Sequence, residues 1–288
     1  MSPGTESPGT DDQAQGALGR ELRGSILLAG AGKMGGALLE GWLGLGLSPE
    51  RLIVIEPQPT DAIVSLTDRG LCLNPPQGLD REIAAAVIAV KPQIAPEVVP
   101  ALRSFIRGGT IVVSIMAGRT LRFLQASLPD TALVRAMPNT PAAIGRGITV
   151  AVPNSKVSAT QRKLVHALLS AVGRVEWIED EAFMDPVTAV SGSGPAYVFL
   201  LCEAMARAGC AAGLPRALAE ALARATVAGS GELLQRSELD PAILRENVTS
   251  PGGTTAAALD ILMGNDGLPA LMQKAIAAAT KRSRELAG

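Results

Sequence analysis

A glycine pattern near the start of the chain is the first feature that could do chemistry. It fits G-x-G-x-x-G and stands between the apolar run Ser25–Ala29 and a helix-like stretch. In that setting the first glycine makes a tight turn, the second lets the backbone approach a pyrophosphate, and the third lets helix and strand pack closely. An ordinary glycine-rich turn is the alternative. The context favours a dinucleotide site formed by Gly30, Ala31, Gly32, Lys33, Met34 and Gly35.

An acidic residue follows this loop at a distance typical of dinucleotide sites. Glu56 closes the predicted strand 51–55, about 20 residues after Gly35, where a carboxylate can meet a ribose 2′-hydroxyl. No Lys or Arg follows before Arg69, so a 2′-phosphate would face a carboxylate and no cation. The pattern therefore favours NADH over NADPH. The alternative is a solvated carboxylate at a strand end.

Two more segments close predicted strands, and ligands of open α/β sheets lie outside the carboxyl ends of their strands. We therefore expect both segments to border the same cofactor. Lys91 is predicted to contact the ribose or the nicotinamide, although a solvated loop lysine is an alternative. The residues assigned to the cofactor from these segments are Ala89, Val90, Lys91, Pro92, Ala117 and Gly118.

The stretch from Asn247 to Thr255 combines hydroxyls, paired glycines and a predicted helix start. Backbone N–H groups in such a turn can hold a substrate carboxylate without an arginine, whereas a plain capped turn is the alternative. The surrounding half has no histidine, and no lysine lies between Lys163 and Lys274. Reduction of a carbonyl usually needs a proton donor such as His, Lys or Tyr. A cyclic iminium already carries its proton, so hydride can add to it directly.

The elements that position these residues divide the chain into an α/β half and a helical half. Apolar runs alternate with amphipathic stretches as far as about residue 178, which predicts a parallel sheet with helices on both faces. In this half, Ser158 is predicted to be the N-cap of an amphipathic helix. The remainder is rich in Ala and Leu and predicts helices alone, with Ser193 as a helix N-cap. Strands are expected at 25–29, 51–55, 84–90, 110–115, 131–135, 147–152 and 174–178. We expect a disordered tail over 1–22, a dinucleotide-binding domain over 23–178 and a helical domain over 179–288.

Composition excludes several function classes. The 288 residues suggest about two domains. The 26 basic residues balance 27 acidic ones, and aromatic residues make up 2%, which disfavours nucleic-acid binding. His166 is the one histidine, so no metal site is predicted.

The cysteine content and the hydropathy of the chain indicate the cellular compartment. The three cysteines form no C-x-x-C pair, which is typical of a reducing cytoplasm. No apolar run approaches about 18 residues free of charge, glycine or proline, so no membrane association is expected.

With these motifs in place, the chain resembles the pyrroline-5-carboxylate reductase family from about Ser25 to its C-terminus. The resemblance implies NAD(P)H-dependent reduction of 1-pyrroline-5-carboxylate to L-proline, the last step of proline synthesis. It also implies an α/β Rossmann domain followed by an all-α dimerisation domain, similar to the C-terminal domain of 6-phosphogluconate dehydrogenase. Homodimers are expected, and rings of dimers such as decamers occur in the family. The matching stretches are 30–35, 89–93, 114–118, 134–141, 189–198 and 247–259.

Residue roles follow from the same resemblance. Thr255 would place its hydroxyl on the ring nitrogen of the substrate, and Lys91 would approach the cofactor and the substrate mouth. Glu238 and Asn247 are similar to polar supports in relatives, and Asn139 lies in a matching stretch assigned to the cofactor. Many relatives use NADPH, whereas the Glu56 carboxylate of this chain cannot bind the 2′-phosphate of NADPH favourably. The substrate loop would comprise Val248, Ser250, Gly252, Gly253, Thr254 and Thr255.

Two alternatives belong to other classes. A β-hydroxyacid dehydrogenase of similar architecture uses a lysine on an interdomain helix, and the absence of lysine from 164 to 273 disfavours it. A non-catalytic sensor of the dinucleotide would need no carboxylate-binding turn, and the intact stretch from Asn247 to Thr255 disfavours that role.

Overall fold

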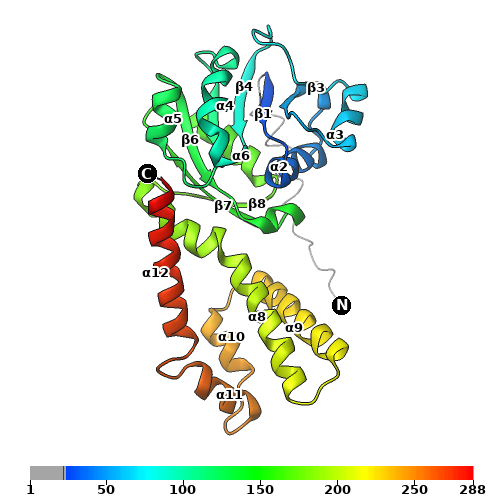
Figure 1. The fold of residues 1–288 in the computed structure, drawn as a ribbon, viewed down its shortest axis with the longest axis vertical. Helices are drawn as coiled ribbons and strands as arrows, with labels where there is room; N and C mark the ends of the chain where they lie inside the picture. Colours follow the sequence, from blue (N-terminus) through cyan, green and yellow to red (C-terminus); the bar gives the residue numbers. More distant parts are fainter. Residues whose placement is uncertain (1–21, 23, 288) are drawn as a thin grey trace, which may run out of the picture. The chain divides into compact units, whose positions relative to one another are not determined.

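The structure is a computed structural model that describes Leu22 and residues 24–287. The tail expected over 1–22 lies outside these residues, apart from Leu22. The described chain forms two compact units (Figure 1). The first runs to Gly192 and includes the residues from Ser283 onward, and the second spans Ser193–Arg282. The segment from Glu181 to Gly192 therefore clusters with the first unit.

An eight-stranded sheet forms the centre of the first unit, in the order β3-β2-β1-β4-β5-β6-β7-β8. Every neighbouring pair is parallel except β6 with β7. The exception differs from the predicted all-parallel sheet, and it arises because the intervening turn holds only the short 3₁₀ helix η5 (Thr140–Ile144) and no crossover helix. The strands are β1 (Ser25–Ala29), β2 (Leu52–Ile55), β3 (Cys72–Leu73), β4 (Ile83–Ile88), β5 (Ile111–Ser114), β6 (Ala132–Met137), β7 (Gly147–Pro153) and β8 (Gly173–Trp177).

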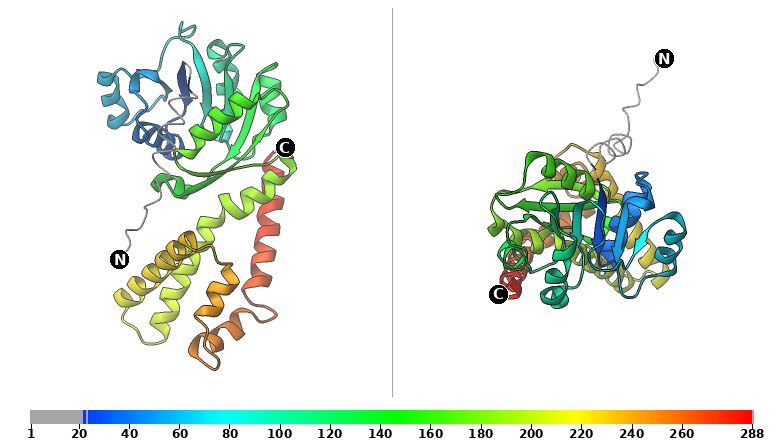
Figure 2. Two further views of the ribbon diagram at one scale, coloured as in Figure 1. Left: turned by 180° about the vertical axis from the view of Figure 1, so that it is seen from behind. Right: turned by 90° about the horizontal axis from the view of Figure 1, so that it is seen from above.

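Helices cover both faces of this sheet, as predicted (Figure 2). One face packs against α2 (Lys33–Gly44) and α6 (Ala159–Ser170), and Trp42 on α2 donates its indole N–H to the Leu168 carbonyl at 2.8 Å. The other face packs against α4 (Ala95–Ala101) and α5 (Leu121–Ser127). The central strands β1, β2 and β4 are buried on both faces, and their sequences are accordingly almost entirely apolar.

Shorter elements complete the sheet's surroundings. The predicted N-cap at Ser158 is confirmed, because its side chain and that of Gln161 form a reciprocal capping box at the start of α6. Two helical segments are mixed in type: 61–69 is α3 (Asp61–Ser65) followed by a 3₁₀ turn, and the 3₁₀ helix η3 (Pro92–Ile94) directly precedes α4.

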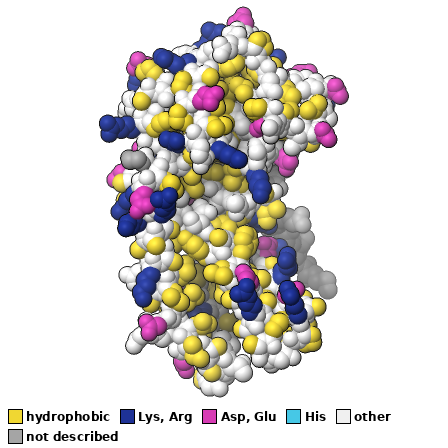
Figure 3. Space-filling model, viewed as in Figure 1, with side chains coloured by type: hydrophobic (Ala, Val, Ile, Leu, Met, Phe, Trp, Pro, Cys, Tyr) yellow, Lys and Arg dark blue, Asp and Glu magenta, His cyan; other side chains and the backbone are white. Residues whose placement is uncertain are grey.

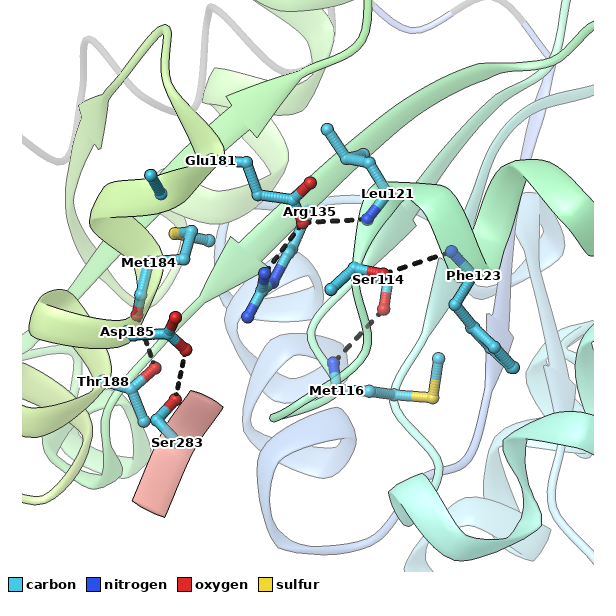
Figure 4. Close-up of polar contacts among 12 residues, drawn as sticks. Ser114, Met116, Leu121, Phe123, Arg135, Glu181, Met184, Asp185, Thr188 and Ser283 are labelled. Atoms are coloured by element: carbon cyan, nitrogen blue, oxygen red, sulfur yellow. Dashed lines mark hydrogen bonds and ion pairs between the residues drawn. The ribbon is translucent and has the colours of Figure 1, made fainter. Parts of the chain in front are cut away.

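The segment that closes the first unit is tied to the sheet by charged hydrogen bonds (Figure 4). It comprises the 3₁₀ helix η6 (Glu181–Phe183), α7 (Met184–Val187) and the π-helix η7 (Thr188–Gly192). Glu181 Oε1 accepts from Arg135 Nη1 at 2.8 Å and from the Leu121 N–H at 2.8 Å. Asp185 accepts from the Ser283 hydroxyl at 2.7 Å.

The second unit contains helices alone among its described residues, as expected. Neighbouring helices α8 and α9 pack side by side. Proline lies in the first turn of α8 and α10. Ser193 occupies the N-cap position of α8 but makes no side-chain cap, because its backbone is already helical at φ −86° and continues the π-turn. The helices are α8 (Gly194–Ala211), α9 (Arg216–Arg236), α10 (Pro241–Asn247), α11 (Thr254–Leu262) and α12 (Leu268–Ala287), whose last turn from Ser283 belongs to the first unit.

Apolar side chains of the second unit are largely exposed, and they gather over its helices in Figure 3. Ala219 and Ala223 are its buried hydrophobic residues in the described chain, whereas Phe199 and Leu200 are 68% and 61% exposed. By length and composition alone, the helical stretch Glu181–Ala211 is also long and apolar enough to cross a membrane.

Candidate active site

The glycine loop after β1 has the geometry that its sequence pattern predicts. Gly30 has φ +89°, and a side chain there would press against the backbone of Ala89 at 2.9 Å. A Cβ on Gly35 would overlap the Gly30 carbonyl oxygen, so the start of α2 packs directly against the turn. At Gly32, in contrast, no atom lies within 4 Å of a built Cβ. The loop is tight at its first and third glycines and open at the second.

The first turn of α2 has the arrangement of an anion site. Gly32 is its N-cap and offers no side chain to accept from the following N–H groups. Those amides and the positive end of the helix dipole favour a phosphate group. Together with the open space at Gly32, they fit the pyrophosphate of a dinucleotide.

Glu56 is held in a fixed position beside this loop. One carboxylate oxygen accepts from the Ala31 N–H at 2.8 Å, and the other accepts from the Gln58 N–H at 3.1 Å. The Asn74 side chain pairs with both backbone groups of Glu56, at 2.8 and 2.9 Å. The carboxylate at the end of β2 therefore adjoins the loop.

The loops after β4 and β5 lie next to each other. The Ile115 N–H donates to the Ile88 carbonyl at 3.0 Å where the strands end. Beyond that point, Arg119 donates through Nε and Nη2 to the Pro92 carbonyl at 3.0 and 2.6 Å. Lys91 and Ala117 are exposed at the two turns.

A further loop follows β6. Asn139 accepts from the Ile148 N–H through Oδ1 at 2.9 Å, which fixes the turn into β7. β1, β2, β4, β5 and β6 are parallel, so their carboxyl ends share one edge of the sheet. The structure brings together at this edge every residue that the sequence assigned to the cofactor: Gly30, Ala31, Gly32, Lys33, Met34, Gly35, Glu56, Ala89, Val90, Lys91, Pro92, Ala117, Gly118 and Asn139.

The residues predicted to bind the substrate lie in the second unit, on and around the turn between α10 and α11. Gly252 has φ +69°, and the Gly253 N–H donates to the Ser250 carbonyl at 3.0 Å. The Thr249 hydroxyl donates to the Arg245 carbonyl at 2.7 Å, which ties the turn to α10. The N-cap of α11 is Gly253, which has no capping side chain, so the first amides of α11 have the arrangement of an anion site.

The side chains around this turn differ in exposure. Thr255 is half-buried in the first turn of α11, whereas Thr254 is exposed. Asn247 and Val248 are exposed at the end of α10, and Glu238 is exposed between α9 and α10. The substrate-directed residues thus form one group in the second unit, and the cofactor-directed residues form another in the first. Within the described residues, no group of three or more His, Cys, Asp and Glu could hold a metal ion.

Sequence reasoning missed three polar contacts around the first group. These are the Arg119 contact with Pro92, the Arg135 contact with Glu181 and the pairing of Asn74 with Glu56. A buried arginine in the apolar run 132–137 was one available signal, because such a side chain needs a partner. The Arg119 and Asn74 contacts have no local sequence pattern.

Two family models match this chain. The family model for pyrroline-5-carboxylate reductase dimerisation matches residues 181–286, and a model for coenzyme F420-dependent NADP oxidoreductases matches 25–118. A pyrroline-5-carboxylate reductase of Synechocystis sp. is 42% identical over 247 residues, covering 83% of this chain and 89% of the relative.

Solved structures give the same result. A pyrroline-5-carboxylate reductase of Coxiella burnetii aligns with a TM-score of 0.84 at 32% identity, covering 92% of this chain and 99% of the other. A pyrroline carboxylate reductase of Plasmodium falciparum with NADP bound has a TM-score of 0.77 at 30% identity, with 92% and 99% coverage. The fold class expected from the sequence is confirmed. The chain belongs to the pyrroline-5-carboxylate reductase family.

Proposed function

We propose that this chain reduces 1-pyrroline-5-carboxylate to L-proline, the final step of proline synthesis, with a reduced nicotinamide dinucleotide. The observation that carries the proposal is the presence, in one chain of this family, of an open glycine loop and an uncapped, hydroxyl-rich helix start. The first suits a dinucleotide pyrophosphate, and the second suits a small carboxylate. When bound, the coenzyme supplies a hydride to the imine carbon of the substrate.

Coenzyme binding falls to the first unit. The amides at the start of α2 bind the pyrophosphate, and Gly32 leaves room for it. Glu56 accepts from the adenosine ribose hydroxyls, while the loops at 89–92, 117–118 and Asn139 border the nicotinamide half. Lys91 lies exposed after β4, where it would approach the substrate mouth.

Substrate binding falls to the turn between α10 and α11. The first amides of α11 hold the substrate carboxylate, and the Thr255 hydroxyl contacts the ring nitrogen. Glu238 and Asn247 support the turn as polar neighbours. The iminium nitrogen keeps its own proton through the reaction, so Thr255 orients that N–H and no separate acid has to deliver a proton. The residues that line the turn are Val248, Ser250, Gly252, Gly253 and Thr254.

The coenzyme is proposed to be NADH in preference to NADPH. Two backbone N–H groups fix the Glu56 carboxylate beside the glycine loop, so its negative charge stands where a 2′-phosphate would come. Glu56→Ser should move the ratio of NADH to NADPH rates toward NADPH. An unchanged ratio in that variant would show that Glu56 only braces the loop.

The assembly is proposed to be a homodimer through the second unit, with decamers as a further step. A dimer explains why apolar residues such as Phe199 and Leu200 are exposed in a single chain. We propose a cytoplasmic protein that binds neither nucleic acid nor membranes. The balanced charge of −1 and the three free cysteines support this.

Oxidation of NADH and of NADPH, each with and without pyrroline-5-carboxylate, tests the proposal. Fast oxidation that depends on the substrate, with L-proline as the product, is expected. Tight dinucleotide binding without turnover would contradict the reductase activity and shift attention to other cyclic imines and hydroxyacids.

A further inference from the structure

Arg119 joins two loops that the proposed function assigns to the nicotinamide half of the coenzyme. It follows Gly118 directly after β5, and its guanidinium donates twice to the carbonyl of Pro92, which follows Lys91 after β4. The guanidinium also lies over the Phe123 ring, 4.8 Å from the ring centre. These contacts hold the planar group on one side by an aromatic face and at its edge by a carbonyl oxygen.

The contact between Arg119 and Pro92 lies beyond the ends of β4 and β5, where the two strands no longer pair. The last backbone hydrogen bond between the two strand ends runs from Ile115 to Ile88. Pro92 and Gly118 lie beyond it, after the ends of β4 and β5, where strand pairing does not set the spacing directly. A two-bond contact from a planar guanidinium fixes both distance and orientation, which a single flexible ammonium does not.

The turn that carries Arg119 also packs closely against the end of α12. Gly118 has φ +68°, and a Cβ built there would lie 3.3 Å from the Leu286 carbonyl. The turn therefore contacts α12 through Gly118 and the β4 loop through the Arg119 hydrogen bonds.

We propose that Arg119 is a positioning residue that sets the spacing of the Lys91–Pro92 and Ala117–Gly118 loops for the nicotinamide half of the coenzyme. This inference rests on the proposed function. The glycine loop follows β1, whereas Arg119 follows β5, and β4 lies between these two strands in the sheet. The hydrogen bonds and the ring contact of Arg119 are with Pro92 and Phe123. Loss of Arg119 should thus weaken binding of the whole dinucleotide and spare binding of the half that lacks nicotinamide.

Binding of NADH and of ADP-ribose, measured by calorimetry on the full chain, tests this directly. The variants are Arg119→Lys, which keeps the charge but loses the planar group, and Arg119→Met, which loses both. Arg122→Lys, at an exposed arginine in the first turn of α5 three residues after Arg119, is the matched control. We expect the Kd of NADH to rise about five- to ten-fold in both Arg119 variants. The Kd of ADP-ribose should stay within about two-fold, and Arg122→Lys should match the wild type.

Two results would overturn the inference. Equal NADH affinity in Arg119→Lys and Arg122→Lys would show that the contact is dispensable. A parallel loss of NADH and ADP-ribose affinity would show general loosening of the domain. Melting curves identify a misfolded variant, and Arg119→Lys serves if Arg119→Met does not fold. Wild-type turnover with pyrroline-5-carboxylate is measured separately, so failure of the reductase activity leaves the binding comparison intact.

Discussion

In the first unit, β1, β4 and β5 lie between helices on both faces, and residues such as Leu27 and Val112 are fully buried. In the second unit, α8 and α9 pack against each other, yet Phe199 and Leu200 remain more than half exposed. The first unit is a sheet covered by helices and the second contains helices alone among its described residues, and the two also differ in how far their apolar side chains are buried. The first unit completes its core within one chain, whereas the second requires another surface to do so.

This contrast separates two kinds of apolar surface. The match of 181–286 to a dimerisation model covers the exposed helices, and the coenzyme-directed residues all lie in the closed unit. A preformed sheet edge can position a large coenzyme without help. The substrate turn lies on the unit whose apolar faces are open, so its rigidity is expected to depend on assembly.

The strongest test of this difference places a charge on an exposed apolar position of each unit. Phe199→Asp should raise the dimer Kd by about 1,000-fold or more. The proposed dimer buries the Phe199 ring, and the variant would bury an unpaired carboxylate there instead. Val64→Asp on α3, 45% exposed, should leave the dimer intact. Sedimentation velocity over a concentration series measures both. A Phe199→Asp chain that dimerises normally would place the interface elsewhere.

A second test uses the two glycines of the phosphate loop. Gly32→Val should raise the dinucleotide Kd by about 100-fold and hardly change the melting temperature, because the space it fills contains no protein atoms. Gly35→Ala should lower the melting temperature, because its Cβ would overlap the Gly30 carbonyl. Calorimetry and thermal melts separate the two effects. Normal dinucleotide affinity in Gly32→Val would refute the assigned phosphate loop.

A third test asks whether the helical unit carries chemistry as well as assembly. Thr255→Val keeps the side-chain shape but removes the hydroxyl, so kcat/KM should fall about 10- to 100-fold, while coenzyme affinity stays unchanged. Thr160→Val, an exposed position on α6, is the control in the first unit. Steady-state kinetics with both substrates measures the change. Full activity of Thr255→Val would remove this hydroxyl from the mechanism.

Sequence predicted most of the fold because its signals are local. The strand–glycine–helix pattern at 25–35 and the capping box at Ser158 each depend on residues close together in the chain. β3 was missed because two residues, Cys72 and Leu73, are too few for a pattern. The strand at 147–152 was predicted, but its antiparallel direction was not, because strand direction depends on the length of the preceding connection.

The residues of the candidate site were likewise chosen from local sequence patterns. Its glycines, Glu56 and the turn before α11 are motifs that a single segment contains. Arg119 and Asn74 act on carbonyls and amides that lie 27 and 18 residues away in the chain, so no local pattern marks them. Long-range polar contacts of this kind depend on the sheet order, which places the β4 and β5 loops side by side.

The smallest change in stability is expected from removing an exposed ion pair, and each unit offers one for comparison. The Lys156 ammonium donates to Asp130 at 2.6 Å, and this hydrogen bond and charge hold the pKa of Asp130 below its usual value of about 3.9. A lowered folded-state pKa stabilises the protein above that usual value, and the contribution is lost as pH falls through the folded-state pKa. In the second unit, the hydrogen bond and charge of Glu220 raise the already high pKa of Arg216. Arg216 therefore stays protonated between pH 3 and 7, and its ionisation does not change the stability in that range.

Asp130→Asn tests this pair without straining the backbone, because asparagine also tolerates the positive φ of 63°. Since Asp130 is almost fully exposed, the variant should melt within about 1 °C of the wild type at pH 7. That small difference should shrink as the pH falls below the usual carboxyl pKa of about 3.9 and toward the lowered pKa of Asp130. Melting curves across this range, with Glu220→Gln as the counterpart, provide the comparison. A difference of several degrees that grows toward acid would mean that Asp130 has a partner more important than Lys156.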